Sequence, residues 1–240
     1  MNEGHKKTPM LVFEESISFS GAAFHCFYHL GVAKFLQKYF DLSKVLFLGA
    51  SAGTFPAFFL GADISIQEVC DKWIPKAYEE FSQKRTGLIF NFCEVIRRNC
   101  LENIPTDAYR IASGRVIMSL TRLTKYSSSN VRISKWSSNE ELLDTAFASG
   151  HIPFLLNKEM FSHLENKTYI DGSITDNQPL INQETICVSP YAWSNLRKIM
   201  SLYPVLSLES NIALVERGYN DAHDHLQHWS RLERFRLLKL

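Results

Sequence analysis

The sequence predicts an α/β fold in which helices flank a largely parallel sheet, and two observations indicate it. Short apolar runs of strand length alternate along the chain with longer segments whose apolar residues recur at helical spacing. No internal repeat, low-complexity tract or linker divides the 240 residues. A chain of this length can bury a sizeable core, so we expect one domain over residues 1–240.

The expected elements follow from local patterns of apolar and turn residues. We expect strands at residues 11–18, 45–48, 115–121, 131–136, 167–170 and 185–188. We expect helices at residues 24–40, 52–60, 66–81, 90–100, 102–112, 138–148 and 211–229. Pro75 should kink or break the third helix, and residues 127–130, Ser-Ser-Ser-Asn, should form a turn or an exposed loop.

Composition describes an ordinary globular protein and disfavours several classes. The formal net charge is +1, which gives no electrostatic reason to expect a nucleic-acid partner. Five scattered cysteines, an odd number, favour reduced thiols over a disulfide framework or a metal site. The apolar run near the N-terminus is too short for a signal peptide, and the uncharged residues 45–62 contain a proline and three glycines. We therefore expect no transmembrane segment and an intracellular protein, soluble or peripherally membrane-associated.

Ser51 is the candidate nucleophile. It lies in Gly49-Ala50-Ser51-Ala52-Gly53, between an apolar run of strand length and a small, apolar segment of helical length. A serine between two glycines at such a turn has the form of a nucleophile elbow, whose strained backbone lifts the hydroxyl clear of the sheet. Strand and helix approach so closely there that positions 49 and 53 must lack a β-carbon. The alternative is a glycine- and alanine-rich turn with an incidental serine.

A serine hydroxyl is a weak nucleophile until a base accepts its proton. The chain offers the order serine, acid, histidine that α/β-hydrolases use, with Asp171 or Asp176 followed by His223, His225 or His228. Only two predicted strands precede the serine, however, and the late histidines lie on a polar helix, where exposure to solvent explains them better. We expect the histidines at positions 25, 29, 151 and 163 to be structural or surface residues.

The competing arrangement is a dyad in which a carboxylate contacts the serine directly. Asp171 is the best candidate, because it ends a predicted strand and precedes Gly172, where the backbone can turn tightly. An aspartate that caps its own turn explains Asp171 equally well from spacing alone. Asp176 fits that turn role better.

Four blocks of sequence resemble the patatin-like phospholipases, particularly the branch that includes adipose triglyceride lipase. The blocks are residues 18–32 with Ser-Phe-Ser-Gly, the serine motif at 49–53, the Asp-Gly block at 169–180, and Arg-Gly-Tyr-Asn-Asp-Ala at 217–222. The first and third blocks are specific, and the order and spacing of all four agree from Phe13 to Leu226. The resemblance implies a three-layer α/β fold with a central, mostly parallel sheet.

The resemblance also implies a catalytic dyad and an oxyanion hole. The dyad carries onto Ser51 as nucleophile and Asp171 as general base. The oxyanion hole carries onto the backbone N–H groups of Gly21, Ala22 and Ala23. N–H groups that open a helix point together at an anion, which agrees with this assignment. No metal or cofactor is implied.

The chain departs from the family pattern at three places. Alanine stands where glycine is usual at position 22 or 23, Phe24 stands where many members have Arg or Lys, and Ser173 follows the Asp-Gly pair. An alanine in the loop is unstrained only where φ is negative. These departures leave every reacting atom in place, but they allow for a weakened or altered site.

We therefore expect a serine carboxylic-ester hydrolase that acts on a glycerolipid or phospholipid through an acyl-serine, with peripheral contact to a membrane or lipid surface. The alternatives are a catalytically silent lipid-binding protein on the same fold and an acyltransferase. The basic and apolar residues 231–240 fit either an interfacial helix or, better, an ordinary C-terminal helix packed on the core.

Overall fold

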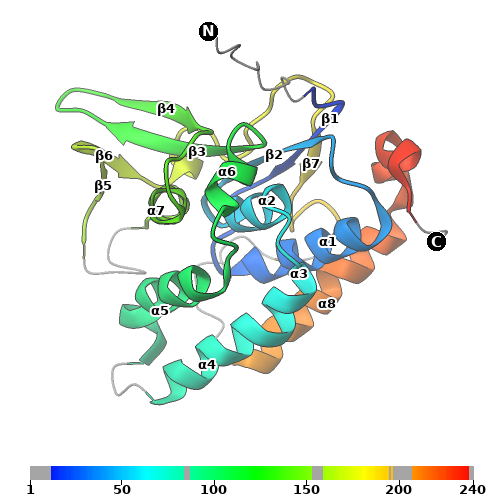
Figure 1. Cartoon of the computed structure of the whole chain (residues 1–240), viewed down its shortest axis with the longest axis horizontal. Coiled ribbons are helices and arrows are strands. Elements are labelled where there is room, and N and C mark those ends of the chain that lie inside the picture. The colour runs from blue at the N-terminus through cyan, green and yellow to red at the C-terminus, as the bar shows by residue number, and fades with distance from the viewer. Residues whose placement is uncertain (1–11, 84–86, 153–158, 195, 197–206, 238–240) are drawn as a thin grey trace, which may run out of the picture.

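The computed structural model describes residues 12–83, 87–152, 159–194, 196 and 207–237. Within these residues, seven strands form one mixed sheet in the order β5-β6-β3-β2-β1-β7, and β4 pairs with β3 outside that path (Figure 1). The adjacent strands β3, β2, β1 and β7 pair in parallel. The pairs β3–β4, β3–β6 and β5–β6 are antiparallel. The strands are β1 (Glu15–Phe19), β2 (Val45–Ala50), β3 (Val116–Leu123), β4 (Ser128–Ile133), β5 (Ser162–Leu164), β6 (Lys167–Ile170) and β7 (Ile186–Val188).

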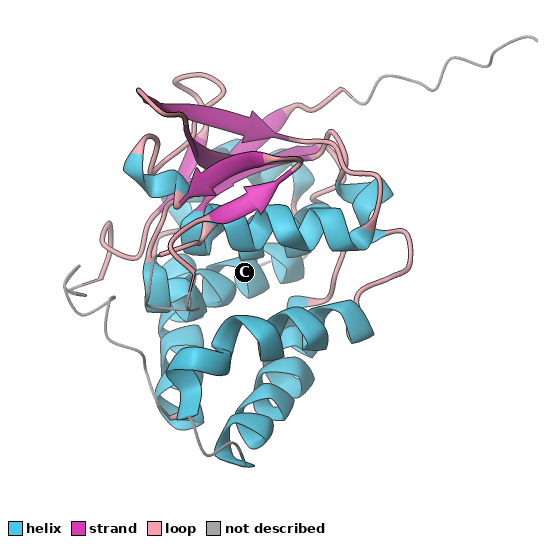
Figure 2. Cartoon of the chain, turned by 90° about the vertical axis from the view of Figure 1, so that its left-hand side faces the viewer, coloured by secondary structure: helices cyan, strands magenta, loops and turns pink. Residues whose placement is uncertain are grey.

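Most helices gather on one side of this sheet (Figure 2). α2 packs on β1, β2 and β3, α7 packs on β3, β5 and β6, and α1 lies between α2 and α8. The expected α/β fold with a mostly parallel sheet flanked by helices is thus confirmed. The helices are α1 (Cys26–Tyr39), α2 (Thr54–Gly61), α3 (Ile66–Glu68), α4 (Ile74–Gln83), α5 (Gly87–Asn103), α6 (Ala108–Ala112), α7 (Asn139–Ser149) and α8 (Leu208–Asp224).

The two faces of the parallel strands differ in chemistry because successive side chains of a strand point to opposite faces. One face is apolar and fully buried, with Ile17, Phe19, Phe47, Met118 and Leu120. The other face carries hydroxyls and is covered by the segment that joins β6 to β7. Ser16 Oγ donates to Thr185 Oγ1 at 2.9 Å, and Gln178 Nε2 donates to Ser18 Oγ at 2.9 Å. Side-chain hydrogen bonds therefore fix the chain that follows Asp171 against the sheet.

Three strand expectations need correction. β1 begins at Glu15, so residues 12–14 precede it and residue 11 lies outside the described residues. The turn expected at residues 127–130 is wrong, because β4 already begins at Ser128 and the hairpin turns at 124–127. Residues 134–136 lie beyond the end of β4, and the short β5 has no counterpart among the expected strands. Pairing with a neighbouring strand decides these polar edge segments more than their own propensity does.

Two helix expectations also change. The helix expected at 66–81 changes its hydrogen bonding just before Pro75, because a π-helical turn (Val69–Trp73) joins α3 to α4 and Pro75 is the second residue of α4. The helix expected at 211–229 spans Leu208–Asp224 and continues as a 3₁₀ helix, η6 (Leu226–Phe235). Residues 45–62 form β2, a short turn and α2, as expected, and no helix in the described part of the chain is long and apolar enough to cross a membrane.

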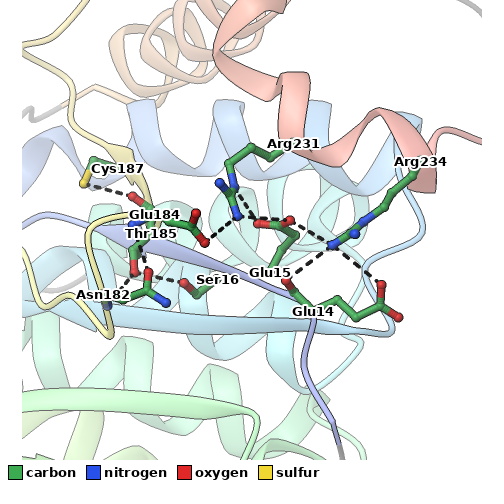
Figure 3. A network of polar contacts seen from close by, with 9 residues as sticks. All are labelled: Glu14, Glu15, Ser16, Asn182, Glu184, Thr185, Cys187, Arg231 and Arg234. Atoms are coloured by element: carbon green, nitrogen blue, oxygen red, sulfur yellow. Dashed lines mark hydrogen bonds and ion pairs between the residues drawn. The ribbon is translucent and has the colours of Figure 1, made fainter.

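The C-terminal segment η6 packs on the core and pairs with the first strand. Trp229 and Leu232 are fully buried. Arg231 and Arg234 each place a guanidinium nitrogen 2.8 Å from a carboxylate oxygen of Glu15 (Figure 3). The basic residues of this segment therefore hold the chain's end against β1, as in an ordinary C-terminal helix packed on the core.

Candidate active site

Ser51 lies where β2 ends and a 3₁₀ turn, η2 (Ser51–Gly53), leads into α2. Its φ is +52°, in the left-handed region that costs a non-glycine residue about 1–2 kcal/mol. The N–H of Ser51 donates to Ser149 Oγ at 3.0 Å, and Ser149 Oγ donates to the Ser119 carbonyl at 2.7 Å. Thr54 Oγ1 lies 2.9 Å from the same Ser149 Oγ. A buried hydroxyl at the end of α7 therefore fixes the strained residue.

The glycines on either side of Ser51 allow the backbone segments to approach closely. A β-carbon on Gly49 would lie 2.5 Å from the carbonyl oxygen of Gly53, across the turn. A β-carbon on Gly53 would lie 2.3 Å from the carbonyl oxygen of Phe19 at the end of β1. Both distances are below van der Waals contact, so any larger residue at either position would displace backbone.

Ser51 and Asp171 are 120 residues apart in sequence and in direct contact in the structure. Ser51 Oγ donates to Asp171 Oδ2 at 2.6 Å, and both residues are buried. Asp171 follows β6, and its other oxygen, Oδ1, accepts the N–H of Ser173 at 2.8 Å. Its backbone is held too, because its N–H donates to the His151 carbonyl at 3.0 Å and its carbonyl accepts from Thr121 Oγ1 at 2.8 Å. Each backbone and side-chain group of Asp171 is therefore fixed.

Burial raises the pKa of the Asp171 carboxyl above its ordinary value. The hydrogen bonds from Ser51 and Ser173 oppose that shift. A carboxylate with a raised pKa accepts a proton more readily than an exposed one. The environment therefore makes Asp171 a stronger base than a surface aspartate.

The residues of the alternative triad lie elsewhere. Asp176 pairs with Arg132, whose guanidinium nitrogen lies 2.9 Å from the carboxylate. Because Ser51 and Asp171 are hydrogen-bonded directly, no histidine lies between them. The late histidines have other partners: Asp224 for His223, the Trp193 ring for His225, and the Cys187 carbonyl for His228.

The three predicted oxyanion donors are not equivalent. The N–H of Gly21 already donates to the Asn177 carbonyl at 3.0 Å, so this N–H has an acceptor within the protein. Ala22 and Ala23 lead into the 3₁₀ turn η1 (Ala23–His25) before α1, and the first N–H groups of a helix have no acceptor within it. Ala23 has φ of +44°, the conformation that favours glycine. A β-carbon on Gly21 would lie 1.9 Å from Ser173 Oγ, so this loop packs tightly against the Asp171 turn.

Sequence reasoning missed the supporting residues of this site. Ser149, Ser119 and Thr121 hold the backbones of Ser51 and Asp171 through side-chain or carbonyl groups. None of the three belongs to a motif, so only the alternation of residues along β3 could have placed Thr121 on the hydroxyl face. Among the described residues, no group of three or more His, Cys, Asp or Glu side chains is arranged to hold a metal ion.

Comparisons with known proteins found a family model and several relatives that are similar to this chain. A family model described as Patatin-like phospholipase matches residues 17–182. Patatin-like phospholipase domain-containing protein 2 of Homo sapiens is 35% identical over 184 residues, which cover 74% of this chain and 36% of that protein. The 1-acylglycerol-3-phosphate O-acyltransferase Pnpla3 of Mus musculus is 29% identical over 182 residues, which cover 73% of this chain and 43% of that protein. The crystal structure of VipD from Legionella pneumophila has a TM-score of 0.43 at 15% identity and covers 72% of this chain and 49% of that one.

The chain thus spans less than half the length of these two curated relatives. The family match covers more than half of the chain and includes both Ser51 and Asp171. The chain belongs to the patatin-like phospholipase family.

Proposed function

We propose that this protein hydrolyses fatty-acyl esters of a glycerolipid or phospholipid, with Ser51 as nucleophile and Asp171 as general base. The observation that carries the proposal is the 2.6 Å hydrogen bond from Ser51 Oγ to a buried carboxylate whose pKa is raised. The names of the relatives, a phospholipase domain protein and an acyltransferase of acylglycerol phosphate, support a lipid ester as substrate. The reaction class is that of a serine carboxylic-ester hydrolase.

In the first half of the reaction, Asp171 accepts the Ser51 proton as Oγ attacks the ester carbonyl carbon. The carbonyl oxygen gains negative charge and is stabilised by backbone N–H groups of the loop before α1. Ala22 and Ala23 supply these donors, because the Gly21 N–H is bonded to Asn177. The C–O bond of the ester then breaks, the alcohol leaves with the proton from Asp171, and the acyl group stays on Ser51.

In the second half, water attacks the acyl-serine and gives a proton to Asp171. The bond between Ser51 Oγ and the acyl carbon breaks, Oγ recovers the proton, and a free fatty acid leaves. The two protonation states of Asp171 thus alternate within one turnover. No third side chain is required for the proton to move, because the carboxylate already contacts Oγ.

The test is the release of fatty acid from triacylglycerol emulsions and phosphatidylcholine vesicles. Wild type should release fatty acid, whereas Ser51→Ala and Asp171→Asn should not. Asp176→Asn is the matched control, since Asp176 lies on the same segment and pairs with Arg132. Wild-type hydrolysis by Ser51→Ala or Asp171→Asn would overturn the proposal.

Acyl transfer to an alcohol is a second candidate, and the match to a 1-acylglycerol-3-phosphate acyltransferase is the observation that favours it. The same acyl-serine would form, and an acceptor hydroxyl would replace water in the second half. Product analysis with 1-acylglycerol 3-phosphate present separates the two. A diacylated product identifies a transferase, and free fatty acid alone identifies a hydrolase.

A catalytically silent lipid-binding protein is a third candidate, favoured by the engaged Gly21 N–H and the strained Ala23. It predicts binding of lipid vesicles without release of fatty acid. Arg231 and Arg234 both pair with Glu15, so the structure gives these two residues a role in holding the C-terminal segment against β1.

A further inference from the structure

Asn130 lies in β4, directly opposite Thr121 of β3. Its amide nitrogen, Nδ2, donates to two hydroxyl oxygens on the hydroxyl face of the sheet, Ser119 Oγ at 2.7 Å and Thr175 Oγ1 at 3.2 Å. Nδ2 also approaches the Leu120 carbonyl at 3.3 Å, so its two protons serve three acceptors. Asn130 therefore joins the hydroxyls of β3 to the segment that connects β6 to β7.

A first chain of hydrogen bonds runs from Asn130 to the backbone of Asp171. A threonine hydroxyl has one proton to donate. Thr121 donates its proton to the Asp171 carbonyl at 2.8 Å, so Thr175 must supply the proton of the 2.7 Å bond between the two hydroxyls. Thr175 Oγ1 in turn accepts from Asn130. Every bond of this chain therefore points from the amide of Asn130 toward the Asp171 carbonyl.

A second chain runs from Asn130 to the backbone of Asp176. Asn130 donates to Ser119 Oγ, and Ser119 Oγ donates to the Asp176 carbonyl at 3.3 Å. Asp171 and Asp176 stand on either side of the 3₁₀ turn η4 (Gly172–Ile174). One amide thus holds both ends of the turn that carries Asp171, in each case through a hydroxyl of β3.

The direction of these bonds matters for the contact between Asp171 and Ser51. Without the protons of Asn130, Thr121 could donate to Thr175 instead, and the Asp171 carbonyl would lose its side-chain donor. The two hydroxyls on β3 are fully buried, so water cannot freely replace a lost partner there. The carboxylate of the same turn contacts Ser51 Oγ at 2.6 Å. A displacement of about 1 Å in such a contact can lower a rate by about 10²-fold.

We propose that Asn130 is a positioning residue for the general base: its N–H groups set the direction of both hydrogen-bond chains and keep the Asp171 carboxylate in contact with Ser51. The role of Asp171 as base rests on the proposed function, but the hold of Asn130 on the turn does not. One experiment therefore measures the turn itself, and a second measures turnover.

The first experiment measures amide hydrogen exchange of the peptide that covers residues 171–176, by mass spectrometry. Two N–H groups of this turn donate to the Gly172 carbonyl, so their exchange reports opening of the turn. Asn130→Ala should speed the exchange about five- to tenfold, the effect of losing one buried hydrogen bond. Asn139→Ala is the matched control, because the Asn139 side chain also binds two backbone groups, but around the start of α6. Equal exchange in wild type and Asn130→Ala would overturn the proposal, whether or not the protein hydrolyses an ester.

The second experiment measures steady-state hydrolysis of a soluble ester. Asn130→Ala should lower kcat by about 10- to 100-fold and change KM by less than about twofold, because the base moves while the substrate site does not. Thr175→Val should also lower kcat, whereas Thr175→Ser keeps the hydroxyl and should restore it. Thr175 is exposed, so both of its variants should fold, and thermal unfolding checks every variant. Wild-type kcat in Asn130→Ala and Thr175→Val, or an equal loss in Asn139→Ala, would overturn the proposal.

The double variant Asn130→Ala with Thr175→Val tests whether the two residues act in one chain. Its kcat should be close to that of Asn130→Ala alone, because the second change removes a bond that the first has already disturbed. Losses that multiply would show two independent effects and would contradict the chain. If wild type hydrolyses no ester, the proposed function fails, and hydrogen exchange still decides whether Asn130 holds the turn.

Discussion

Two carboxylates of this protein, Asp171 and Glu15, are both buried, but Glu15 contacts cations and Asp171 contacts neutral hydrogen-bond donors. The Glu15 side chain is 6% exposed and contacts two cations, Arg231 and Arg234, each at 2.8 Å (Figure 3). Asp171 is buried too, but its oxygens accept from neutral donors, the Ser51 hydroxyl at 2.6 Å and the Ser173 N–H at 2.8 Å. Among the described residues, no lysine or arginine forms an ion pair with Asp171.

The difference shows how one chain uses burial of a carboxylate both for stability and for reactivity. A buried charge is tolerated when it is paired, and Glu15 with its two arginines ties the end of the chain to β1. Without a cation, burial raises the pKa of Asp171 and leaves it able to accept a proton from Ser51. Changes at Asp171 should therefore affect turnover, and changes around Glu15 should affect the free energy of unfolding.

The largest effect should be the loss of kcat when Asp171 is replaced. Asp171→Asn keeps the shape of the side chain but cannot accept the Ser51 proton, so kcat should fall by about 10⁴-fold, as for positioned groups that act with a serine nucleophile. Glu15→Gln should leave kcat within about twofold, because Glu15 is at the other end of β1 from the site. Steady-state hydrolysis of a soluble ester checks both, and equal losses in the two variants would contradict the contrast.

The second-largest effect is on the free energy of unfolding. It concerns Glu15 and its two arginines, and it depends on which partner is removed. Arg231→Met combined with Arg234→Met leaves Glu15 buried without a cation and should lower the free energy of unfolding by about 3 kcal/mol. Glu15→Gln should cost only about 1 kcal/mol, because the arginine side chains are 39% and 52% exposed and can return to water. Urea denaturation measures both losses, and the reverse order would show that Glu15 is not the costly charge.

The pH dependence separates the two roles of Asp171. Hydrolysis needs its carboxylate, so kcat should fall about tenfold per unit as pH drops below its raised pKa. The contribution of Asp171 to stability has the opposite dependence on pH. Because the folded pKa is above the unfolded one, the contribution of Asp171 to stability is full below the unfolded pKa and is lost as pH rises through the folded pKa.

Asp171→Asn should accordingly be more stable than wild type at neutral pH and should flatten this part of the stability profile. Thermal unfolding from acid to neutral pH, with Asp176→Asn as the control, measures it. A variant less stable than wild type at neutral pH would contradict the raised pKa.

The smallest effect concerns the oxyanion loop. Ala23 has φ of +44°, so Ala23→Gly should relieve strain and stabilise the protein by up to about 1 kcal/mol. Ala22 has φ of −151°, outside the left-handed region that favours glycine, so Ala22→Gly should destabilise slightly through the entropy of the unfolded chain. Melting temperatures of the two variants should move in opposite directions. A shift of both in the same direction would mean that the loop relaxes without strain.

The local sequence predicted those residues of the site that belong to sequence motifs. The Gly-Ala-Ser-Ala-Gly motif and the Asp-Gly block located Ser51 and Asp171, and the structure joins them by one hydrogen bond. The apolar runs also located most strands and helices, because burial on a sheet or helix face requires that spacing.

Long-range polar contacts could not be predicted in this way. Ser149 fixes the Ser51 backbone from 98 residues away, and Glu15 meets Arg231 across 216 residues. A single serine or a single ion pair leaves no periodic signal, so only the assembled fold reveals its partner. The same holds for the Gly21 N–H, whose acceptor is a backbone carbonyl that any residue at 177 would carry.

The most direct measurement of the Ser51–Asp171 dyad is the rate of labelling by a fluorophosphonate, with the modified residue mapped by mass spectrometry. Wild type and Asp176→Asn should be labelled at Ser51 at similar rates, and Asp171→Asn should be labelled far more slowly. Labelling of Asp171→Asn at the wild-type rate, or labelling at a residue other than Ser51, would show that the buried carboxylate does not activate this hydroxyl.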